Sequence, residues 1–266
     1  MKKMLLLGGT GIVGSGTIEK ALVDGYEINA IGLEPNPNLS KSVNQHIYNR
    51  LNEGEFSNFI LQLTSEMGGW DVVFDVIGSQ DKDAQQTCDL FRNSGTRLIF
   101  LSTTLVYSRT EKTNYPLPST HPIASLGEMG GYVDKKVRME QYIQSQTLPW
   151  TILRPYHILG PHSLLGCIPD HNRDPELIDR LKRGEALSLC NGGDINFNIV
   201  HPADIGRAVL AIANNPQTIH KTYNCVNPEP VSAREYYAEI ARQVGGTLKI
   251  KSKSYQEIWD EHGGWE

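Results

Sequence analysis

Tyr132 and Lys136, two residues suited to proton transfer, lie four positions apart within GGYVDKKVRMEQYI, residues 130 to 143. On a helix this spacing places both side chains on one face. Free tyrosine has a pKa near ~10, so it acts as an acid or base near neutrality only where its environment favours the phenolate. The positive charge of Lys136 has that effect. An exposed helix could carry the same pair without any chemistry, so the surrounding elements decide between the two interpretations.

A glycine-rich turn near the N-terminus is the second feature with chemical meaning. GGTGIVG places Gly8, Gly11 and Gly14 at a GxxGxxG spacing, directly after the apolar run at residues 3 to 7. Between a strand and a helix, such a turn lets backbone N–H groups approach a pyrophosphate at the helix N-terminus. The sequence therefore predicts a dinucleotide-binding site.

Glu34 indicates which dinucleotide this site takes. It lies twenty residues after Gly14, near the end of the predicted second strand, where an acidic side chain holds the adenosine ribose hydroxyls. No lysine or arginine lies between Lys20 and Lys41, so a 2′-phosphate has no evident partner in that segment. This favours NAD over NADP.

The elements that position these residues alternate between strand and helix, which predicts an α/β fold with a Rossmann-type, doubly wound parallel sheet. Strands are expected at residues 3–7, 26–33, 46–49, 71–78, 96–104, 150–155 and 222–226. A helix is expected after the glycine turn, and others at 56–66, 81–93, 132–145, 175–183 and 232–245. Residues 200–214 are expected to form a strand end, a turn containing Asp204, and a helix.

The predicted domains follow from this order. The dinucleotide-binding domain is expected at 1–159, with 195–226 returning to it, and a small C-terminal substrate lobe at 160–194 and 227–266.

Composition narrows the function classes. The chain has 25 Lys and Arg against 30 Asp and Glu, a formal net charge of -5, and no dense basic run, which argues against a nucleic-acid partner. No apolar run approaches the ~18 residues of a membrane span, so the expected protein is soluble and cytoplasmic. Four widely spaced cysteines are expected to be buried or free thiols: Cys88, Cys167, Cys190 and Cys225.

Five segments together resemble a known family. GGTGIVG, LSTTLVY, YVDKK, TILRPYHILGP and NIVHPADIGRA occur in this order over residues 1 to about 245. They resemble the extended short-chain dehydrogenases/reductases, the NAD-dependent epimerase/dehydratase family, in a divergent branch. The resemblance implies hydride transfer with bound NAD, and a homodimer formed through the helices at 81–93 and 132–145.

The resemblance also assigns roles to single residues. Tyr132 is the implied acid/base, Lys136 also binds the nicotinamide ribose, and Thr103 hydrogen-bonds the substrate oxygen. The implied cofactor-binding residues are Gly8, Thr10, Gly11, Ile12, Val13, Gly14, Glu34, Ile77, Ser102, Tyr132, Lys136, Pro155 and His157. On the substrate side it implies Thr104, with His171 and Arg173 holding an anionic group, although their polar segment is equally compatible with an exposed loop.

Two segments depart from the family pattern. Thr104 and Leu105 occupy the positions where the dehydratases carry Asp and Glu, which disfavours elimination of water. The strand at 71–78 ends in DVIG where nucleotide-sugar epimerases usually show His-x-Ala-Ala. The expected function is an NAD-dependent epimerase of a sugar, with a nucleotide sugar as the expected substrate. The alternatives are a reductase of a small carbonyl compound and a non-catalytic cofactor- or RNA-binding relative.

A metal site is not expected. His157, His162 and His171 have spacings that fit no compact set of helical ligands, and hydride transfer to a nicotinamide needs no metal.

Overall fold

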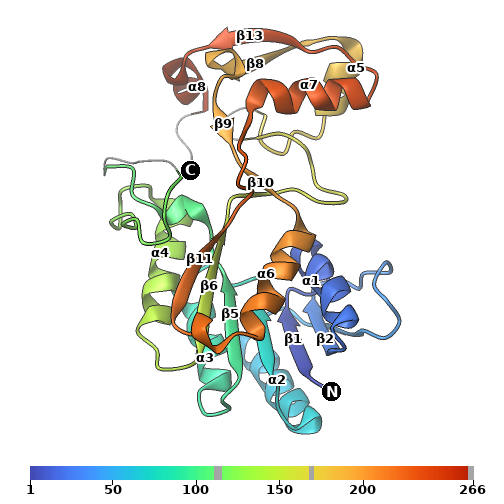
Figure 1. Cartoon of the computed structure of the whole chain (residues 1–266), viewed down its shortest axis with the longest axis vertical. Coiled ribbons are helices and arrows are strands. Elements are labelled where there is room, and N and C mark those ends of the chain that lie inside the picture. The colour runs from blue at the N-terminus through green and yellow to red at the C-terminus, as the bar shows by residue number, and fades with distance from the viewer. Residues whose placement is uncertain (111–115, 168–170, 263–266) are drawn as a thin grey trace. The chain divides into compact units, whose positions relative to one another are not determined.

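Seven strands form one sheet in the order β11-β6-β5-β4-β1-β2-β3, shown in the computed structural model of Figure 1. Five of them are mostly apolar and buried, whereas the edge strands β3 and β11 are more polar and partly exposed. Every neighbouring pair is parallel, so the carboxyl ends of all seven strands meet at one edge. The strands are β1 (Lys3–Leu7), β2 (Glu27–Gly32), β3 (Asn44–Ile47), β4 (Val72–Asp75), β5 (Arg97–Leu101), β6 (Trp150–Pro155) and β11 (Lys221–Cys225). The predicted doubly wound α/β class is confirmed.

The structure describes residues 1–110, 116–167 and 171–262. The chain forms two compact units. The first, which holds the parallel sheet, is Met1–Tyr156 with His201–Cys225, and the second is His157–Val200 with Val226–Glu266.

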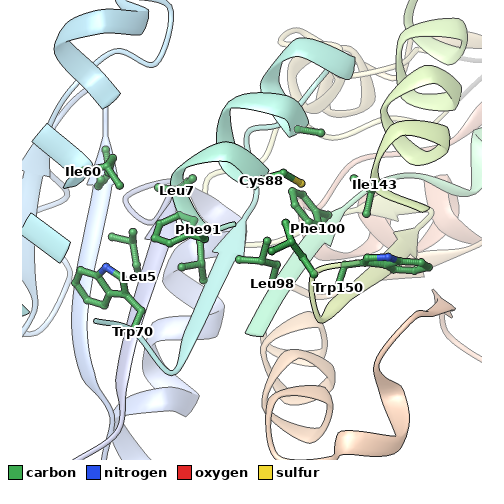
Figure 2. Packing of buried hydrophobic residues seen from close by; sticks show 14 of the residues in the cluster. Leu5, Leu7, Ile60, Trp70, Cys88, Phe91, Leu98, Phe100, Ile143 and Trp150 are labelled. Atoms are coloured by element: carbon green, nitrogen blue, oxygen red, sulfur yellow. The ribbon is translucent and has the colours of Figure 1, made fainter. Parts of the chain in front are cut away.

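Helices cover both faces of the sheet in the first unit. They are α1 (Ile12–Val23), α2 (Glu53–Met67), α3 (Asp81–Phe91), α4 (Gly131–Gln144) and α6 (Pro202–Ala213), with short 3-10 turns at Thr104–Val106 and Pro216–Thr218. Strand residues alternate between the faces, because successive side chains of a strand point in opposite directions. On one face, β-strand residues such as Leu5, Leu98 and Phe100 pack with α2, α3 and α4 to form the main core, as Figure 2 shows.

Helices α1 and α6 pack closely together through two glycines. A Cβ atom at Gly206 would lie 2.5 Å from the carbonyl oxygen of Gly16, and one at Gly16 would lie 2.5 Å from the carbonyl carbon of Pro202. Both distances are shorter than van der Waals contact, so neither position has room for a side chain.

Substitution of Gly206 by alanine is therefore expected to lower the free energy of unfolding by about 1 to 3 kcal/mol, because helix backbones must move apart. Gly54 in α2 is the matched control, since a Cβ there would meet no atom within 4 Å. Gly54→Ala is expected to stabilise the protein by up to about 1 kcal/mol through helix propensity. Urea denaturation of both variants tests this, and equal midpoints would contradict it.

The second unit contains three two-stranded sheets and three helices within the described residues. The pairs are β7 (His157–Ile158) with β10 (Ile199–Val200), β9 (Asn196–Phe197) with β12 (Val231–Ser232), and β8 (Ala186–Cys190) with β13 (Lys249–Lys253). The helices are α5 (Leu177–Arg183), α7 (Ala233–Gln243) and α8 (Tyr255–His262). Of these elements, α5 and α7 were predicted from the sequence, whereas the strands, which are two to five residues long, were not.

Several local expectations are settled by these elements. Gly245 follows α7 with φ 67°, as predicted for a helix stop. Asp204 was expected in a turn, which is wrong: it lies in the first turn of α6, where a carboxylate favours the helix dipole. The four cysteines are buried and form no disulfide, which confirms the prediction.

Two kinds of feature are absent from the described residues. None of their helices has both the length and the apolar content needed to cross a membrane. In the same part of the chain, no group of three or more His, Cys, Asp or Glu side chains is arranged to hold a metal ion.

Candidate active site

The glycine turn joins β1 to α1, and each of its glycines has a different reason to lack a side chain. Gly8 has φ +92°, and a Cβ there would lie 2.5 Å from a side-chain carbon of Ile77. A Cβ at Gly14 would lie 2.4 Å from the backbone of Gly9, so this glycine allows the helix to approach the strand. At Gly11 the nearest atom would be 3.5 Å away, which leaves the backbone open to a ligand.

The N-terminus of α1 has unused hydrogen-bonding capacity. Gly11 is its N-cap and supplies no side chain, and the first turn holds no acidic residue. The first N–H groups of a helix, here those from Ile12 onward, have no partner within the helix, and the helix dipole favours an anion beside them. The open Gly11 and these donors fit the pyrophosphate of a dinucleotide.

Asn36 fixes the geometry of this turn, and the sequence did not reveal it. Its side-chain amide donates to the carbonyl oxygen of Thr10 at 3.0 Å and lies 3.1 Å from the Ser15 hydroxyl. The Asn36 backbone N–H donates to Gln45 Oε1 at 2.8 Å, and Gln45 donates back to the Asn36 carbonyl. The loop after β2, which carries exposed Glu34, is thereby tied to the glycine turn.

Three hydroxyl residues follow β5 at the same edge of the sheet. Thr103 is buried, and its hydroxyl accepts a hydrogen bond from the Leu105 N–H at 3.2 Å, which starts the 3-10 turn. The hydroxyl oxygens of Ser102 and Thr104 are buried and have no hydrogen-bond partner among the described residues. Buried hydroxyls normally find a partner, so these two have free capacity for a bound molecule.

Lys136 links α4 to the ends of two strands. Only 4% of this residue is exposed. Its Nζ donates to the carbonyl oxygen of Leu101, the last residue of β5, at 2.8 Å, and to that of Gly78, beyond β4, at 2.6 Å. Tyr132, one turn earlier, is 51% exposed, and its ring centroid lies 5.9 Å from Lys136 Nζ.

The charge state of Lys136 reflects two opposing effects. Burial lowers its pKa from 10.5 to about 8, while the negative charges of Asp75 and then Glu140 act against this change. The ammonium form therefore persists at neutral pH. A positive charge held beside the Tyr132 ring favours the phenolate form of that tyrosine.

A buried ion pair holds α4 against β6. Arg154 Nη2 lies 2.5 Å from Glu140 Oε2, and the two side chains are 3% and 0% exposed. The same guanidinium lies 4.7 Å from the ring of Tyr107 and donates to the carbonyl oxygen of Ser119 at 3.2 Å. Glu140 is one turn beyond Lys136, so this pair fixes the helix that carries the proposed acid/base residues.

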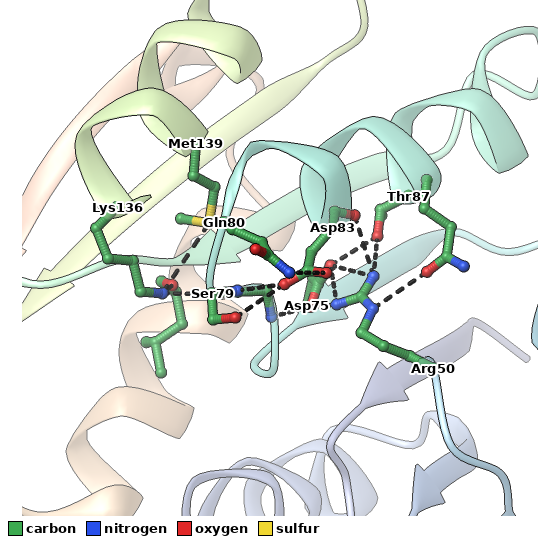
Figure 3. A network of polar contacts seen from close by, with 11 residues as sticks. Arg50, Asp75, Ser79, Gln80, Asp83, Thr87, Lys136 and Met139 are labelled. Carbon is green, nitrogen blue, oxygen red and sulfur yellow. Dashed lines mark hydrogen bonds and ion pairs between the residues drawn. The ribbon is translucent and has the colours of Figure 1, made fainter. Parts of the chain in front are cut away.

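A second buried ion pair joins Asp75, the last residue of β4, to Arg50, which follows β3 in the chain (Figure 3). The sequence signal for it was a charged residue closing the apolar strand Val72–Asp75. Its partner follows β3 in the chain, and no local pattern identified that partner.

The remaining predicted residues are divided between the two units. Pro155 ends β6 in the first unit, whereas His157, His171 and Arg173 lie in the second. Burial, and then the charge of Arg173, lower the pKa of His157. His171 Nδ1 lies 3.3 Å from Asp174 Oδ2, and Arg173 is exposed with φ 51°.

His201 has a structural role at the start of α6. Its Nδ1 accepts a hydrogen bond from the Ala203 N–H at 3.2 Å, which caps the helix. Within the first unit, contacts run from the glycine turn through Ile77 and Gly78 to Lys136 and Leu101, so the predicted cofactor and acid/base residues of that unit share one sheet edge.

A Rossmann sheet with a glycine-rich turn after its first strand, and a buried lysine one turn after a tyrosine, is typical of dinucleotide-dependent enzymes. The model of the NAD dependent epimerase/dehydratase family matches residues 4–225, and the chain belongs to this family.

Relatives are distant in sequence. The chain is 22% identical over 258 residues to the chloroplast stem-loop binding protein of 41 kDa b of Arabidopsis thaliana, covering 92% of this chain and 64% of that protein. It is 27% identical over 214 residues to UDP-D-apiose/UDP-D-xylose synthase 2 of the same plant, covering 67% and 54%. The chain thus spans less than two thirds of the length of these relatives.

Solved structures share the fold. One is a UDP-glucose 4-epimerase with UDP-glucose from Thermotoga maritima, with a TM-score of 0.73 and 17% identity. The match covers 96% of this chain and 87% of that one.

Proposed function

We propose that the protein is an NAD-dependent epimerase of a sugar, with a nucleotide sugar as substrate. The observation that carries the proposal is the placement of buried Lys136, which bonds to the ends of β4 and β5 and lies beside the Tyr132 ring. NAD, when bound, would supply the hydride acceptor for this reaction. Tyr132 takes the proton of the substrate hydroxyl as hydride leaves, and gives it back when the hydride returns to the opposite face of the carbon.

Other residues orient the reactants in this proposal. Thr103 hydrogen-bonds the reacting oxygen, and the unpartnered hydroxyls of Ser102 and Thr104 supply further contacts to cofactor and substrate. Ile77 borders the cofactor beside the glycine turn, and Pro155 and His157 border the nicotinamide. His171 and Arg173 of the second unit hold the diphosphate of the substrate, for which a guanidinium is well suited.

The names of two relatives support a nucleotide sugar. One acts as a UDP-sugar synthase, and one solved structure was determined with UDP-glucose. Incubation of the purified protein with a panel of UDP- and dTDP-sugars, followed by separation of the epimers, tests the proposal. Failure to epimerise any of them, with NADH oxidised by a carbonyl substrate instead, would favour the reductase alternative.

Preference for NAD over NADP is expected to depend on Glu34. In this proposal its carboxylate accepts hydrogen bonds from the two ribose hydroxyls and repels a 2′-phosphate. Glu34→Gln is expected to lower the ratio of the dissociation constant for NADP to that for NAD by about tenfold, the size typical of losing a hydrogen bond to a charged group. Glu19→Gln, on the exposed side of α1, is the control. Calorimetric titration measures both, and an unchanged ratio would exclude this role for Glu34.

A homodimer formed through α3 and α4 also belongs to this proposal, and light scattering tests it. RNA binding is an alternative function, and the name of one Arabidopsis relative, a chloroplast stem-loop binding protein, supports including it. Tight binding of a stem-loop RNA at physiological salt, without turnover of any sugar, would establish it in place of catalysis.

A further inference from the structure

The segment after β4 is held by a buried network centred on Asp75. Arg50 Nη1 lies 3.0 Å from Asp75 Oδ1, and the two side chains are 6% and 1% exposed. Arg50 Nη2 lies 3.2 Å from Asp75 Oδ2 and donates to the backbone carbonyl of Asp83 at 3.1 Å. The Thr87 hydroxyl donates to Asp75 Oδ2 at 2.6 Å. The Asp75 carboxylate is thus held by both Arg50 and Thr87, and it also contacts the segment that follows β4 (Figure 3).

Two carboxylates of this network hold the backbone on which Lys136 rests. The Gly78 N–H donates to Asp75 Oδ1 at 2.8 Å, and the Ser79 N–H donates to Asp83 Oδ2 at 2.8 Å. The carbonyl oxygen of Gly78 accepts from Lys136 Nζ at 2.6 Å. The peptide between residues 78 and 79 therefore has the Asp83 carboxylate at its N–H and the Lys136 ammonium at its carbonyl oxygen, while Asp75 holds the N–H of the preceding peptide. Each contact polarises the peptide in the direction that strengthens the other.

We propose that Asp75, clamped by Arg50, is a positioning residue for Lys136: it fixes the Gly78 backbone that holds the ammonium beside Tyr132. This inference rests on the proposed function for the meaning of Lys136, but its geometry does not depend on any substrate. If the ion pair were purely structural, it would stabilise the fold and leave the pH at which Lys136 loses its proton unchanged. That outcome separates a structural role from a positioning role.

Charged and titratable groups surround Lys136 from several elements. Asp75 lies in β4, Asp83 in α3 and Glu140 in α4. The negative charges of all three favour the ammonium form of Lys136, whereas the positive charge of Arg50 opposes it. Tyr132 lies beside it on α4. Asp75 is the strongest of the favourable charges, so its removal is expected to lower the pH at which Lys136 loses its proton.

The test follows the protonation of Lys136 directly, by NMR of the side chain in protein labelled with 13C-lysine. The Lys136→Met variant assigns its signal. In the unsubstituted protein the midpoint is expected at about 8. In Asp75→Asn it is expected to fall by roughly one pH unit, the size typical of losing a nearby opposite charge. Loss of Asp75 leaves Arg50 buried without its partner, so Arg50→Met/Asp75→Asn provides a variant without that buried charge.

Thr87→Val is the mild variant, since it removes one hydrogen bond to Asp75 and retains both charges. Thr96→Val is its control, because Thr96 is equally buried and donates to the Trp70 carbonyl, away from Lys136. We expect the titration midpoint of Lys136 to fall in Thr87→Val and to remain unchanged in Thr96→Val. An unchanged midpoint in folded Arg50→Met/Asp75→Asn and in Thr87→Val would overturn the proposal. If the predicted shifts occur but the protein has no epimerase activity, the proposed function is overturned and the positioning role of Asp75 stands.

Discussion

Replacement of Tyr132 by phenylalanine is expected to lower turnover of the sugar by about 10² to 10⁴-fold, the contribution typical of a positioned acid/base. The ring, which lies 5.9 Å from Lys136 Nζ, is kept, and only the phenolic oxygen is lost. The dissociation constant for NAD is therefore expected to stay within a factor of about two, because the proposed pyrophosphate contacts of the glycine turn are unchanged by the substitution.

Steady-state rates with the best nucleotide sugar, together with calorimetric titration of NAD, measure this result. Tyr255→Phe is the matched control, since it removes an exposed phenol in α8 of the second unit. Equal turnover in Tyr132→Phe and the unsubstituted protein would show that Tyr132 is not the acid/base. A parallel loss in Tyr255→Phe would point to a nonspecific effect.

Breaking the buried pair of Arg154 and Glu140 is expected to give the largest loss of stability. Arg154→Met leaves the Glu140 carboxylate, which is 0% exposed, without its partner. The expected loss in the free energy of unfolding is about 3 to 5 kcal/mol, because the remaining charge is not solvated. In Arg154→Met/Glu140→Leu the buried charge is gone as well, and at least half of the loss is expected to return.

Urea denaturation followed by tryptophan fluorescence measures both variants. Arg242→Met removes an exposed partner of Glu239 and is expected to change the midpoint little, since exposed ion pairs contribute little. A double variant as unstable as Arg154→Met would contradict this account. Such a result would mean that lost packing against Tyr107, rather than an unpaired carboxylate, accounts for the instability.

The order of elements in the first unit could be predicted because its signals are local. The apolar strands of a parallel sheet are buried on both faces, and the glycine turn and the tyrosine–lysine spacing are short patterns. Residues such as Gly8, Gly14 and Lys136 therefore lie where their spacing indicated, at one edge of the sheet.

The supporting residues could not be predicted, because their partners are distant in the chain. Arg50 and Asp75 are 25 positions apart, and Asn36 contacts Thr10 across 26. Nothing in either local stretch specifies the other. The strands of the second unit were missed for a different reason: a segment such as KIKSK in β13 is mostly exposed, and it is ordered by pairing with β8 rather than by its own apolar pattern.

The central claim is that this edge of the sheet carries out hydride transfer coupled to a tyrosine proton. The most direct test is the absorbance of reduced nicotinamide in the NAD-loaded protein after addition of excess nucleotide sugar. The account predicts a rapid appearance of this absorbance with the unsubstituted protein, and an appearance slowed by about 10² to 10⁴-fold with Tyr132→Phe. Reduction of the cofactor at the same rate in both proteins, or failure of the chain to bind NAD, would contradict it.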